Sequence, residues 1–246
     1  NGMRSIAILL TNTDRSDFAR SFPNDAQRVR QLLQAVRPDW NCVEVALRDG
    51  EPLPAVDAHD GHVITGSPAS VNDTQWPWLP PLLDFIRAAH AKRWPLVGLC
   101  FGHQAVAKAL GGEVKAHPGG WGLGVAQTEW TVQRDWMNPP CPDMPFMHLN
   151  AAHIEQVTRV PEGAQVISRS PFCPVGALQI GSHILTTQYH PEMPLVFMQG
   201  LLDQLASRVD GDTLAKARLS LQQANDAPVM AQWMAQFFEQ AWKAHS

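Results

Sequence analysis

Short apolar runs alternate with amphipathic segments through the first half of the chain. Four runs made mainly of apolar residues span positions 5–11, 42–47, 61–65 and 95–100. Continuous apolar runs of this length are typical of strands buried on both faces of a parallel sheet. Residues 24–36, 78–91 and 103–110 instead carry their apolar positions at helical spacing. The alternation predicts an α/β fold with a doubly wound, mostly parallel sheet flanked by helices.

The middle of the chain has a different pattern. Shorter β-like runs lie at residues 164–168, 175–180 and 183–188, and Gly181-Ser182 is a candidate hairpin turn between the last two. These runs predict a smaller antiparallel, β-hairpin region. Residues 136–145 contain four prolines and are predicted to form a surface loop.

Helical patterns dominate the C-terminal part, at residues 195–209, 213–224 and 228–242. We therefore expect an α/β domain over residues 3–202 and a helical C-terminal extension over 203–246 that packs on it. The last helix has an apolar face made of Met230, Trp233, Met234, Phe237 and Phe238. Packing on the parent domain is the expected role of this face, and a contact with a second copy or a partner is the alternative.

Composition narrows the expected surroundings and partners. The net charge is −4 and no cluster of Lys and Arg stands out, so neither nucleic acid nor an anionic membrane is an expected partner. No apolar stretch approaches the roughly 18 residues that span a bilayer. The four cysteines (Cys42, Cys100, Cys141, Cys173) are far apart and form no C-x-x-C pair, which argues against a disulfide scaffold and a structural zinc site. We expect a cytoplasmic protein without a metal or an organic cofactor.

The strongest chemical signal is the segment Gly98-Leu99-Cys100-Phe101-Gly102-His103-Gln104. A predicted strand runs into a Gly-x-Cys-x-Gly turn and then a helix, which is the pattern of a nucleophile elbow with cysteine in place of serine. The helix dipole at such a turn favours the thiolate form of Cys100. His103 is expected to point along its helix and away from the thiol.

Two further segments follow predicted strands. Tyr189-His190-Pro191-Glu192 offers a base and a carboxylate that fixes the orientation of the imidazole. Thr65-Gly66-Ser67-Pro68 offers a glycine whose N–H, together with the N–H of Phe101, predicts an oxyanion hole. Strand ends of a parallel sheet meet at one edge, so the three segments are expected to converge.

In this order, the three segments resemble the class I (triad) glutamine amidotransferases, which implies a flavodoxin-like fold. The resemblance extends from about Ile6 to about Leu202 and is greatest to stand-alone, GMP-synthase-like members, which also resemble plant γ-glutamyl peptidases. Further matches are Ala109-Leu110-Gly111-Gly112 and Gly120-Trp121-Gly122-Leu123-Gly124.

The resemblance implies roles for individual residues. Cys100 would be the nucleophile, His190 the general base and acid, and Glu192 the orienting carboxylate. Gly66 and Phe101 would form the oxyanion hole. Substrate contacts would come from Gln104, Ala151 and His153. His153 begins the segment His153-Ile154-Glu155-Gln156-Val157, and Ala151 lies two residues before it. This segment departs from the commoner family form, because Ala152 precedes the histidine and Ile154 follows it.

Three functions follow as alternatives. The first is hydrolysis of the γ-amide of glutamine, with ammonia passed to a separate protein, because no P-loop pattern occurs in this chain. The second is a γ-glutamyl peptidase or hydrolase that acts on γ-glutamyl amides or peptides. The third is a non-catalytic binding or regulatory protein on the same scaffold, and the intact triad counts against it. A homo-oligomer is a further expectation.

Overall fold

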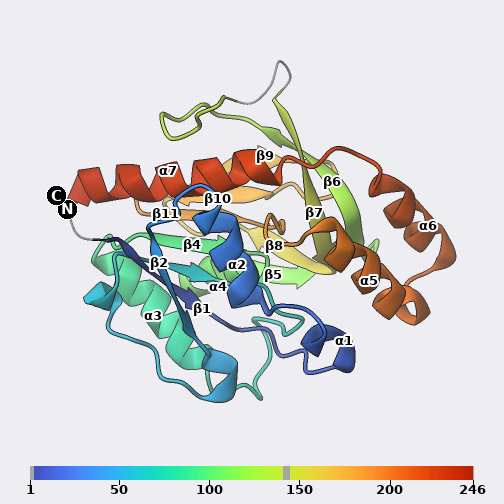
Figure 1. Cartoon of the computed structure of the whole chain (residues 1–246), viewed down its shortest axis with the longest axis horizontal. Coiled ribbons are helices and arrows are strands. Elements are labelled where there is room, and N and C mark those ends of the chain that lie inside the picture. Colours follow the sequence, from blue (N-terminus) through green and yellow to red (C-terminus); the bar gives the residue numbers. More distant parts are fainter. Residues whose placement is uncertain (1–2, 141–144, 246) are drawn as a thin grey trace.

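A central nine-stranded sheet organises the chain (Figure 1), whose computed structural model describes residues 3–140 and 145–245. Its strand order is β2-β1-β3-β4-β11-β10-β9-β6-β7. The parallel half consists of β2 (Asn41–Val45), β1 (Ser5–Leu9), β3 (Gly61–Ile64), β4 (Leu96–Leu99) and β11 (Ile184–Thr187). The antiparallel half consists of β10 (Ala177–Ile180), β9 (Ala164–Arg169), β6 (Gly122–Trp130) and β7 (Phe146–His153). A separate two-stranded sheet pairs β5 (Glu113–Ala116) with β8 (Glu155–Arg159).

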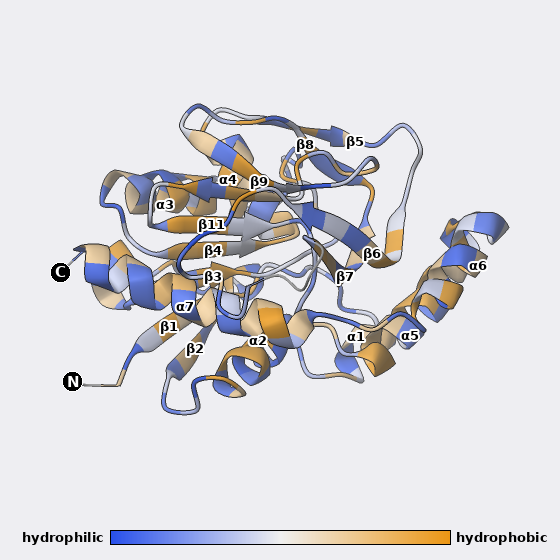
Figure 2. Cartoon of the chain, turned by 90° about the horizontal axis from the view of Figure 1, so that it is seen from above, coloured by the Kyte–Doolittle hydropathy of each residue, from blue (hydrophilic) through white to orange (hydrophobic). Residues whose placement is uncertain are grey.

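Helices cover both faces of the sheet, as Figure 2 shows. On one face lie α3 (Leu79–Ala91) and α4 (Phe101–Ala109), and on the other lie α2 (Asp25–Gln34) and α7 (Ala227–His245). Successive residues of β1 serve the two sides alternately: Ile6 and Ile8 join the core of α2 and α7, whereas Ala7 and Leu9 join the core of α3 and α4. Strands buried on both faces explain the continuous apolar runs, and the predicted doubly wound, mostly parallel sheet is confirmed.

The predicted hairpin around Gly181 is present as β10 and β11. Ile180 pairs with Ile184 across the turn, and Gly181 has a φ of +53°, which favours glycine. The expected surface loop at 136–145 is wrong at its start, because Trp136 and Met137 are each only 2% exposed. Trp136 packs edge-on against Trp233 of α7, so its large apolar ring is withdrawn from water. Residues 141–144 of that loop, including Cys141, lie outside the described residues.

The C-terminal helices are α5 (Leu195–Leu205), α6 (Gly211–Ser220) and α7. The single helix expected over 195–209 changes to a 3-10 turn at Ala206–Arg208, and Asp210 then caps α6 by accepting a hydrogen bond from the Thr213 N–H. The apolar face of α7 belongs to the same core as β1, β3 and β4. A domain boundary at residue 202 therefore stays a prediction.

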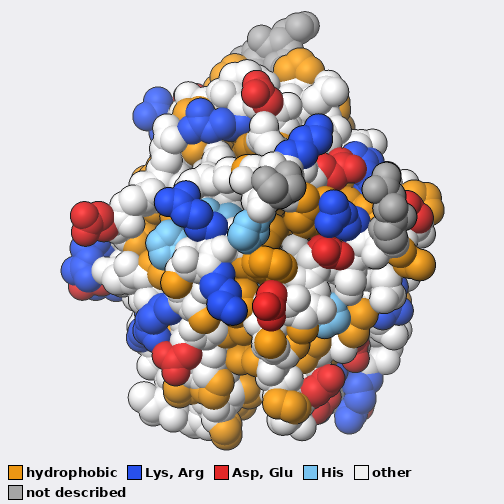
Figure 3. Space-filling view, turned by 90° about the vertical axis from the view of Figure 1, so that its left-hand side faces the viewer, with side chains coloured by type: hydrophobic (Ala, Val, Ile, Leu, Met, Phe, Trp, Pro, Cys, Tyr) orange, Lys and Arg blue, Asp and Glu red, His pale blue; other side chains and the backbone are white. Residues whose placement is uncertain are grey.

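The carboxyl ends of the parallel strands share one edge of the sheet, at the end of the molecule where α1 (Asp17–Arg20) and α5 lie (Figure 1). The loops that follow β1, β3, β4 and β11 all emerge there. The side where both chain ends lie shows acidic and basic side chains interspersed (Figure 3). No helix within residues 3–140 and 145–245 is long and apolar enough to cross a membrane.

Candidate active site

Cys100 occupies a sharp turn between β4 and α4. It has a φ of 51° and a ψ of −102°, a backbone conformation that residues other than glycine rarely adopt. The turn requires both flanking glycines: a Cβ on Gly98 would lie 2.6 Å from the carbonyl oxygen of Gly102, and a Cβ on Gly102 would lie 2.5 Å from the carbonyl oxygen of Ile64. The thiol is thus presented at the carboxyl edge of the sheet, at the N-terminus of α4.

His190 and Glu192 form a buried pair after β11. Nδ1 of His190 is 2.7 Å from Oε1 of Glu192, and the residues are 4% and 5% exposed. The N–H of His190 donates to the carbonyl of Asn150 at 2.8 Å, which anchors the loop to β7. Burial alone lowers the pKa of His190, but Glu192 and Cys100 together outweigh it and raise that pKa well above its usual value.

Gly66 brings the loop after β3 against both groups. A Cβ at this position would lie 2.6 Å from Cε1 of His190 and 3.6 Å from Cβ of Cys100. Phe101 is the first residue of α4, where a backbone N–H has no acceptor inside the helix. The structure therefore brings together Cys100, His190, Glu192 and the backbone of Gly66, as the strand-end argument expects.

Gln188 also contacts the thiol, and the sequence analysis missed it. Its Nε2 lies 3.4 Å from Sγ of Cys100, and its Oε1 accepts a hydrogen bond from Gln104 at 3.2 Å. The available signal was its position: it directly follows β11, two residues before His190.

Two of the three predicted substrate contacts line the cavity beside Cys100, and the third is buried. Gln104 lines the cavity beside Cys100 and donates to the carbonyl of Glu155 at 2.8 Å. His153 also lines it; burial lowers the pKa of His153 to about 4, against an opposing hydrogen bond with the Glu155 carbonyl. Ala151 is only 1% exposed and its side chain packs in the core, so a substrate contact through its backbone stays a prediction. Side chains alternate along a strand, so the adjacent Ala152 faces the cavity instead, and its carbonyl lies 4.0 Å from Sγ of Cys100.

His103 lies in the core, away from the cavity lining. Its ring nitrogens contact Oγ1 of Thr186 at 2.7 Å and the carbonyl of Val175 at 3.1 Å. Burial lowers the pKa of His103 to about 3, although the contact with the Val175 carbonyl opposes the shift. Among the described residues, no group of three or more His, Cys, Asp and Glu side chains suits a metal ion.

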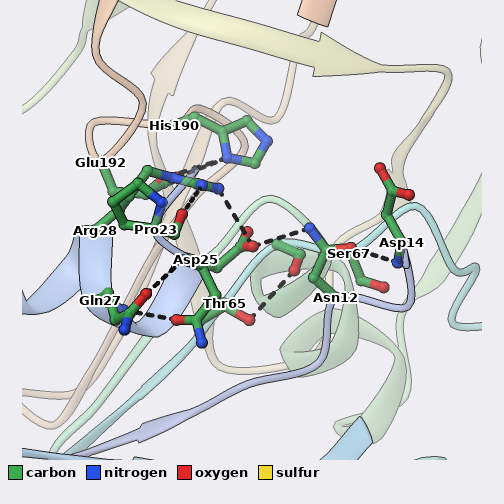
Figure 4. Close-up of polar contacts among 12 residues, drawn as sticks. Asn12, Asp14, Pro23, Asp25, Gln27, Arg28, Thr65, Ser67, His190 and Glu192 are labelled. Atoms are coloured by element: carbon green, nitrogen blue, oxygen red, sulfur yellow. Dashed lines mark hydrogen bonds and ion pairs between the residues drawn. The ribbon is translucent and has the colours of Figure 1, made fainter. Parts of the chain in front are cut away.

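A cavity of about 960 Å³ opens beside Cys100 and His190. It continues from these residues to the loop after β1 and to α1, α2 and α5. Two buried charged residues of α2 line it as well: Asp25 and Arg28, which are each 4% exposed. Figure 4 shows the guanidinium of Arg28 paired with the carboxylate of Asp25.

Comparison with known proteins places this geometry in a family. The model of the family described as "Glutamine amidotransferase class-I" matches residues 26–196. A glutamine amidotransferase-like protein of Schizosaccharomyces pombe is 29% identical over 203 residues, which cover 76% of this chain and 78% of that protein. γ-Glutamyl peptidase 2 of Arabidopsis thaliana is 26% identical over 172 residues, covering 68% and 67% of the two chains. The glutamine-hydrolysing GMP synthase of Actinobacillus succinogenes is 28% identical over 176 residues, which are 68% of this chain and 31% of that longer protein.

The fold itself has solved counterparts. A glutamine amidotransferase of Thermotoga maritima superimposes with a TM-score of 0.75 at 16% identity, covering 97% of each chain. The likeness shows that the flavodoxin-like arrangement of sheet and helices is shared. The family model spans most of the chain, including Cys100 and His190, and the chain belongs to the class I glutamine amidotransferase family.

Proposed function

We propose that the protein hydrolyses the γ-amide of glutamine through a thioester on Cys100, with His190 and Glu192 completing the triad. One observation carries the proposal: a cysteine at a strained strand–helix turn and a buried, carboxylate-paired histidine both lie within 4 Å of the position that a Cβ on Gly66 would take. Such a group of nucleophile, base and orienting carboxylate is what acyl transfer by a thiol requires.

The reaction proceeds in two halves. The Cys100 thiolate attacks the γ-carbonyl carbon, a carbon–sulfur bond forms, and negative charge collects on the carbonyl oxygen. Protonated His190 gives its proton to the nitrogen, the carbon–nitrogen bond breaks, and ammonia leaves. His190 then takes a proton from water, the hydroxide adds to the thioester, and the carbon–sulfur bond breaks. Glutamate leaves, and the thiolate and the protonated imidazole are restored.

The surrounding groups have separate tasks in this scheme. The N–H groups of Gly66 and Phe101 meet the charge on the oxygen, and one such donor is worth about 3–4 kcal/mol. Proton transfer by His190 supplies roughly a 10²–10⁴-fold acceleration. Glu192 fixes the tautomer of His190 and stabilises its protonated form, consistent with the raised pKa of His190.

Hydrolysis of larger γ-glutamyl amides or peptides is the second candidate. The cavity volume of about 960 Å³ favours it, because it is far more than the side chain of a single amino acid fills. The similarity to a γ-glutamyl peptidase of Arabidopsis thaliana points the same way. The chemistry at Cys100 is identical for both candidates, and only the leaving amine differs.

The partners and the compartment belong to the same proposal. With glutamine as substrate, ammonia would pass to a separate acceptor protein, in keeping with the similarity to one part of a larger GMP synthase. A reducing, cytoplasmic compartment would preserve the nucleophile, and Cys42, Cys100 and Cys173 are all free thiols here.

The test compares wild-type protein with Cys100→Ala. Wild-type protein should release glutamate and ammonia from glutamine, and added hydroxylamine should divert the thioester to γ-glutamyl hydroxamate. The variant should give neither product, because Cys100 is the one cysteine among the described residues that line the cavity. Its thermal unfolding should stay close to that of wild type, which controls for loss of the fold. Turnover that survives in the variant would remove Cys100 from the mechanism.

A further inference from the structure

His190 and Glu192 lie in a short loop that joins β11 to α5. Two residues of this loop, Pro191 and Pro194, have no N–H to donate, so the loop has fewer backbone groups with which to anchor itself. Both oxygens of Glu192 approach the same atom, Nδ1 of His190, at 2.7 and 3.3 Å. The pair thus fixes its own geometry, and its place in the molecule depends on how the loop is held.

Asn150 of β7 holds this loop at two points. Its backbone carbonyl accepts a hydrogen bond from the N–H of His190 at 2.8 Å, and its side-chain Nδ2 donates to the carbonyl of Met193 at 2.7 Å. One residue therefore brackets the stretch 190–193, which contains both the imidazole and the carboxylate. Two hydrogen bonds fix the position and the rotation of the backbone between them, and functional side chains keep their geometry only where such supporting bonds exist.

The open edge of β7 makes these contacts available. β7 is the last strand of the sheet and pairs with β6 along its other edge. Backbone groups of alternate residues point to the same edge of a strand, and the carbonyls of Asn150 and Ala152 both lie on the open one. The first meets the N–H of His190 at 2.8 Å, and the second lies 4.0 Å from Sγ of Cys100. A single strand edge thus contacts both the loop of the base and the nucleophile.

The side chain of Asn150 is paired at both ends of its carboxamide. Asn150 is 3% exposed, and its Oδ1 accepts a hydrogen bond from Nδ2 of Asn225 at 3.1 Å. The oxygen therefore faces Asn225 and the nitrogen faces Met193. A buried amide costs free energy unless its polar atoms are paired, and asparagine is uncommon within strands. The contacts with the loop, and not packing in the strand, account for an asparagine at this position.

Asn225 connects Asn150 to the C-terminal helices. It lies between α6 and α7, and its Oδ1 accepts a hydrogen bond from the N–H of Ala227, the first residue of α7, at 2.9 Å. The next residue, Asp226, is bound to β7: its N–H donates to the carbonyl of His148 at 2.8 Å, and its Oδ2 accepts from the N–H of His148 at 2.7 Å. A segment beyond the residues that match the family model is thus fixed on β7 and reaches the loop of the triad.

Packing by itself does not hold the back of the loop. A second cavity, of about 490 Å³, lies there, and its lining includes Asn150, Glu192, Met193 and Asn225. A side chain that borders a cavity lacks part of the close contacts that keep a core residue in place. The hydrogen bonds of Asn150 therefore decide where the carboxylate of Glu192 lies.

We propose that Asn150 is a positioning residue: by holding the loop at two points, it sets where the proposed base and its carboxylate lie relative to the thiol. Asn225 keeps the carboxamide of Asn150 in the orientation that this task requires, which gives the segment between α6 and α7 a part in catalysis. The inference rests on the proposed function, because it concerns the same His190–Glu192 pair. Asn150 acts through the backbone of the loop and takes part in no bond-making step.

Asn150→Leu is the first test, because leucine has a similar size and its side chain forms no hydrogen bonds. It should lower kcat for glutamine or a γ-glutamyl compound roughly 10- to 100-fold, as expected when a reacting group is displaced by up to about 1 Å, and change KM much less. The control is Gln223→Leu, the same change at a residue that lines the second cavity and bonds to Ser220 through its backbone. Equal losses in both variants, or an unchanged kcat in Asn150→Leu, would overturn the assignment.

Asn225→Asp is a milder variant that keeps the test valid if Asn150→Leu does not fold. Asn225 is exposed, and aspartate retains the acceptor for the N–H of Ala227 but loses the donor to Asn150. The variant should lower kcat roughly 2- to 10-fold, the range of one ordinary hydrogen bond, while its thermal unfolding stays close to that of wild type. A wild-type kcat would overturn the proposal.

The pKa of His190 gives a readout that a purely structural role would not change. Burial lowers this pKa, but Glu192 and Cys100 outweigh burial and raise it well above its usual value. NMR titration of 13C-labelled histidine should show it falling toward that value in Asn150→Leu and staying in place in Gln223→Leu. An unchanged pKa in Asn150→Leu would overturn the proposal. Wild-type protein that hydrolyses no γ-glutamyl compound would instead overturn the proposed function, and the titration would then decide the role of Asn150 by itself.

Discussion

At the scale of single residues, the site combines a strained backbone with buried charges, and the rest of the fold must offset the free energy that these features cost. Cys100 adopts a positive φ, and His190 and Glu192 lie almost without solvent. A strained backbone and a buried ion pair each cost free energy, and both persist only where the surroundings hold them in place. Gln188 and the loop after β3 supply those surroundings by contacting the thiol and the imidazole.

The sign of the His190 shift fixes how stability depends on pH. Because the pKa of His190 is raised in the folded protein, protonation favours folding. This contribution is complete below the unfolded pKa of about 6.5 and is lost as the pH rises through the higher folded value.

We expect Glu192→Gln to lower the pKa of His190, because a neutral amide no longer stabilises the imidazolium. The alkaline limb of the pH profile of kcat/KM should then move to lower pH, together with a fall in its maximum. Profiles of wild type and variant on the same γ-glutamyl substrate measure the shift. An alkaline limb that stays in place would assign it to a group other than His190.

At the scale of elements, the site depends on how closely three strand ends approach. The loop after β3 reaches the loop after β11 through Gly66, β4 meets its own helix α4 through Gly98, and α4 meets β3 through Gly102. Each approach leaves less room than a single methyl group needs. Glycine is therefore a requirement of the geometry at these positions and not merely a turn residue.

We predict that Gly66→Ala displaces His190 and lowers kcat/KM by at least about 100-fold, since a shift of about 1 Å at a reacting group has that effect. Steady-state kinetics measure the loss, and thermal unfolding reports whether the fold persists. Gly211→Ala is the matched control, because a Cβ at Gly211 meets nothing within 4 Å. Full activity in Gly66→Ala would show that the loop yields without moving the imidazole.

At the scale of the whole molecule, α7 connects distant parts of the chain. Trp233 of α7 is fully buried and packs edge-on against Trp130 of β6, with ring centroids 5.0 Å apart. Phe238 of the same helix packs edge-on against Trp40, which precedes β2, with ring centroids 6.1 Å apart. The last helix thus spans the sheet from its parallel to its antiparallel half.

Trp233→Ala should therefore destabilise the entire protein by about 3–5 kcal/mol, as expected for a buried tryptophan that leaves a cavity. Urea unfolding followed by circular dichroism gives the free energy of unfolding. Leu219→Ala is the control, since Leu219 is 66% exposed and its loss should change stability by less than about 0.5 kcal/mol. A small effect at Trp233 would mean that α7 packs as a separable extension.

Much of the fold could be predicted from local patterns. The strands at 5–9, 61–64 and 96–99 coincide with apolar runs, because a strand buried on both faces must be apolar throughout. The burial of Trp136 could not, since it depends on Trp233, a packing partner far away in the chain.

The sequence by itself determined the fold class, the family and the order of the three strand-end motifs, because periodicity and turn requirements are encoded in neighbouring residues. Only the tertiary structure decided that Gln188 contacts a thiol 88 positions away, that Ala152 and not Ala151 faces the cavity, and that Arg28 lines it. Contacts of this kind depend on the distances and burial that arise when separate elements pack together, and no local pattern records them.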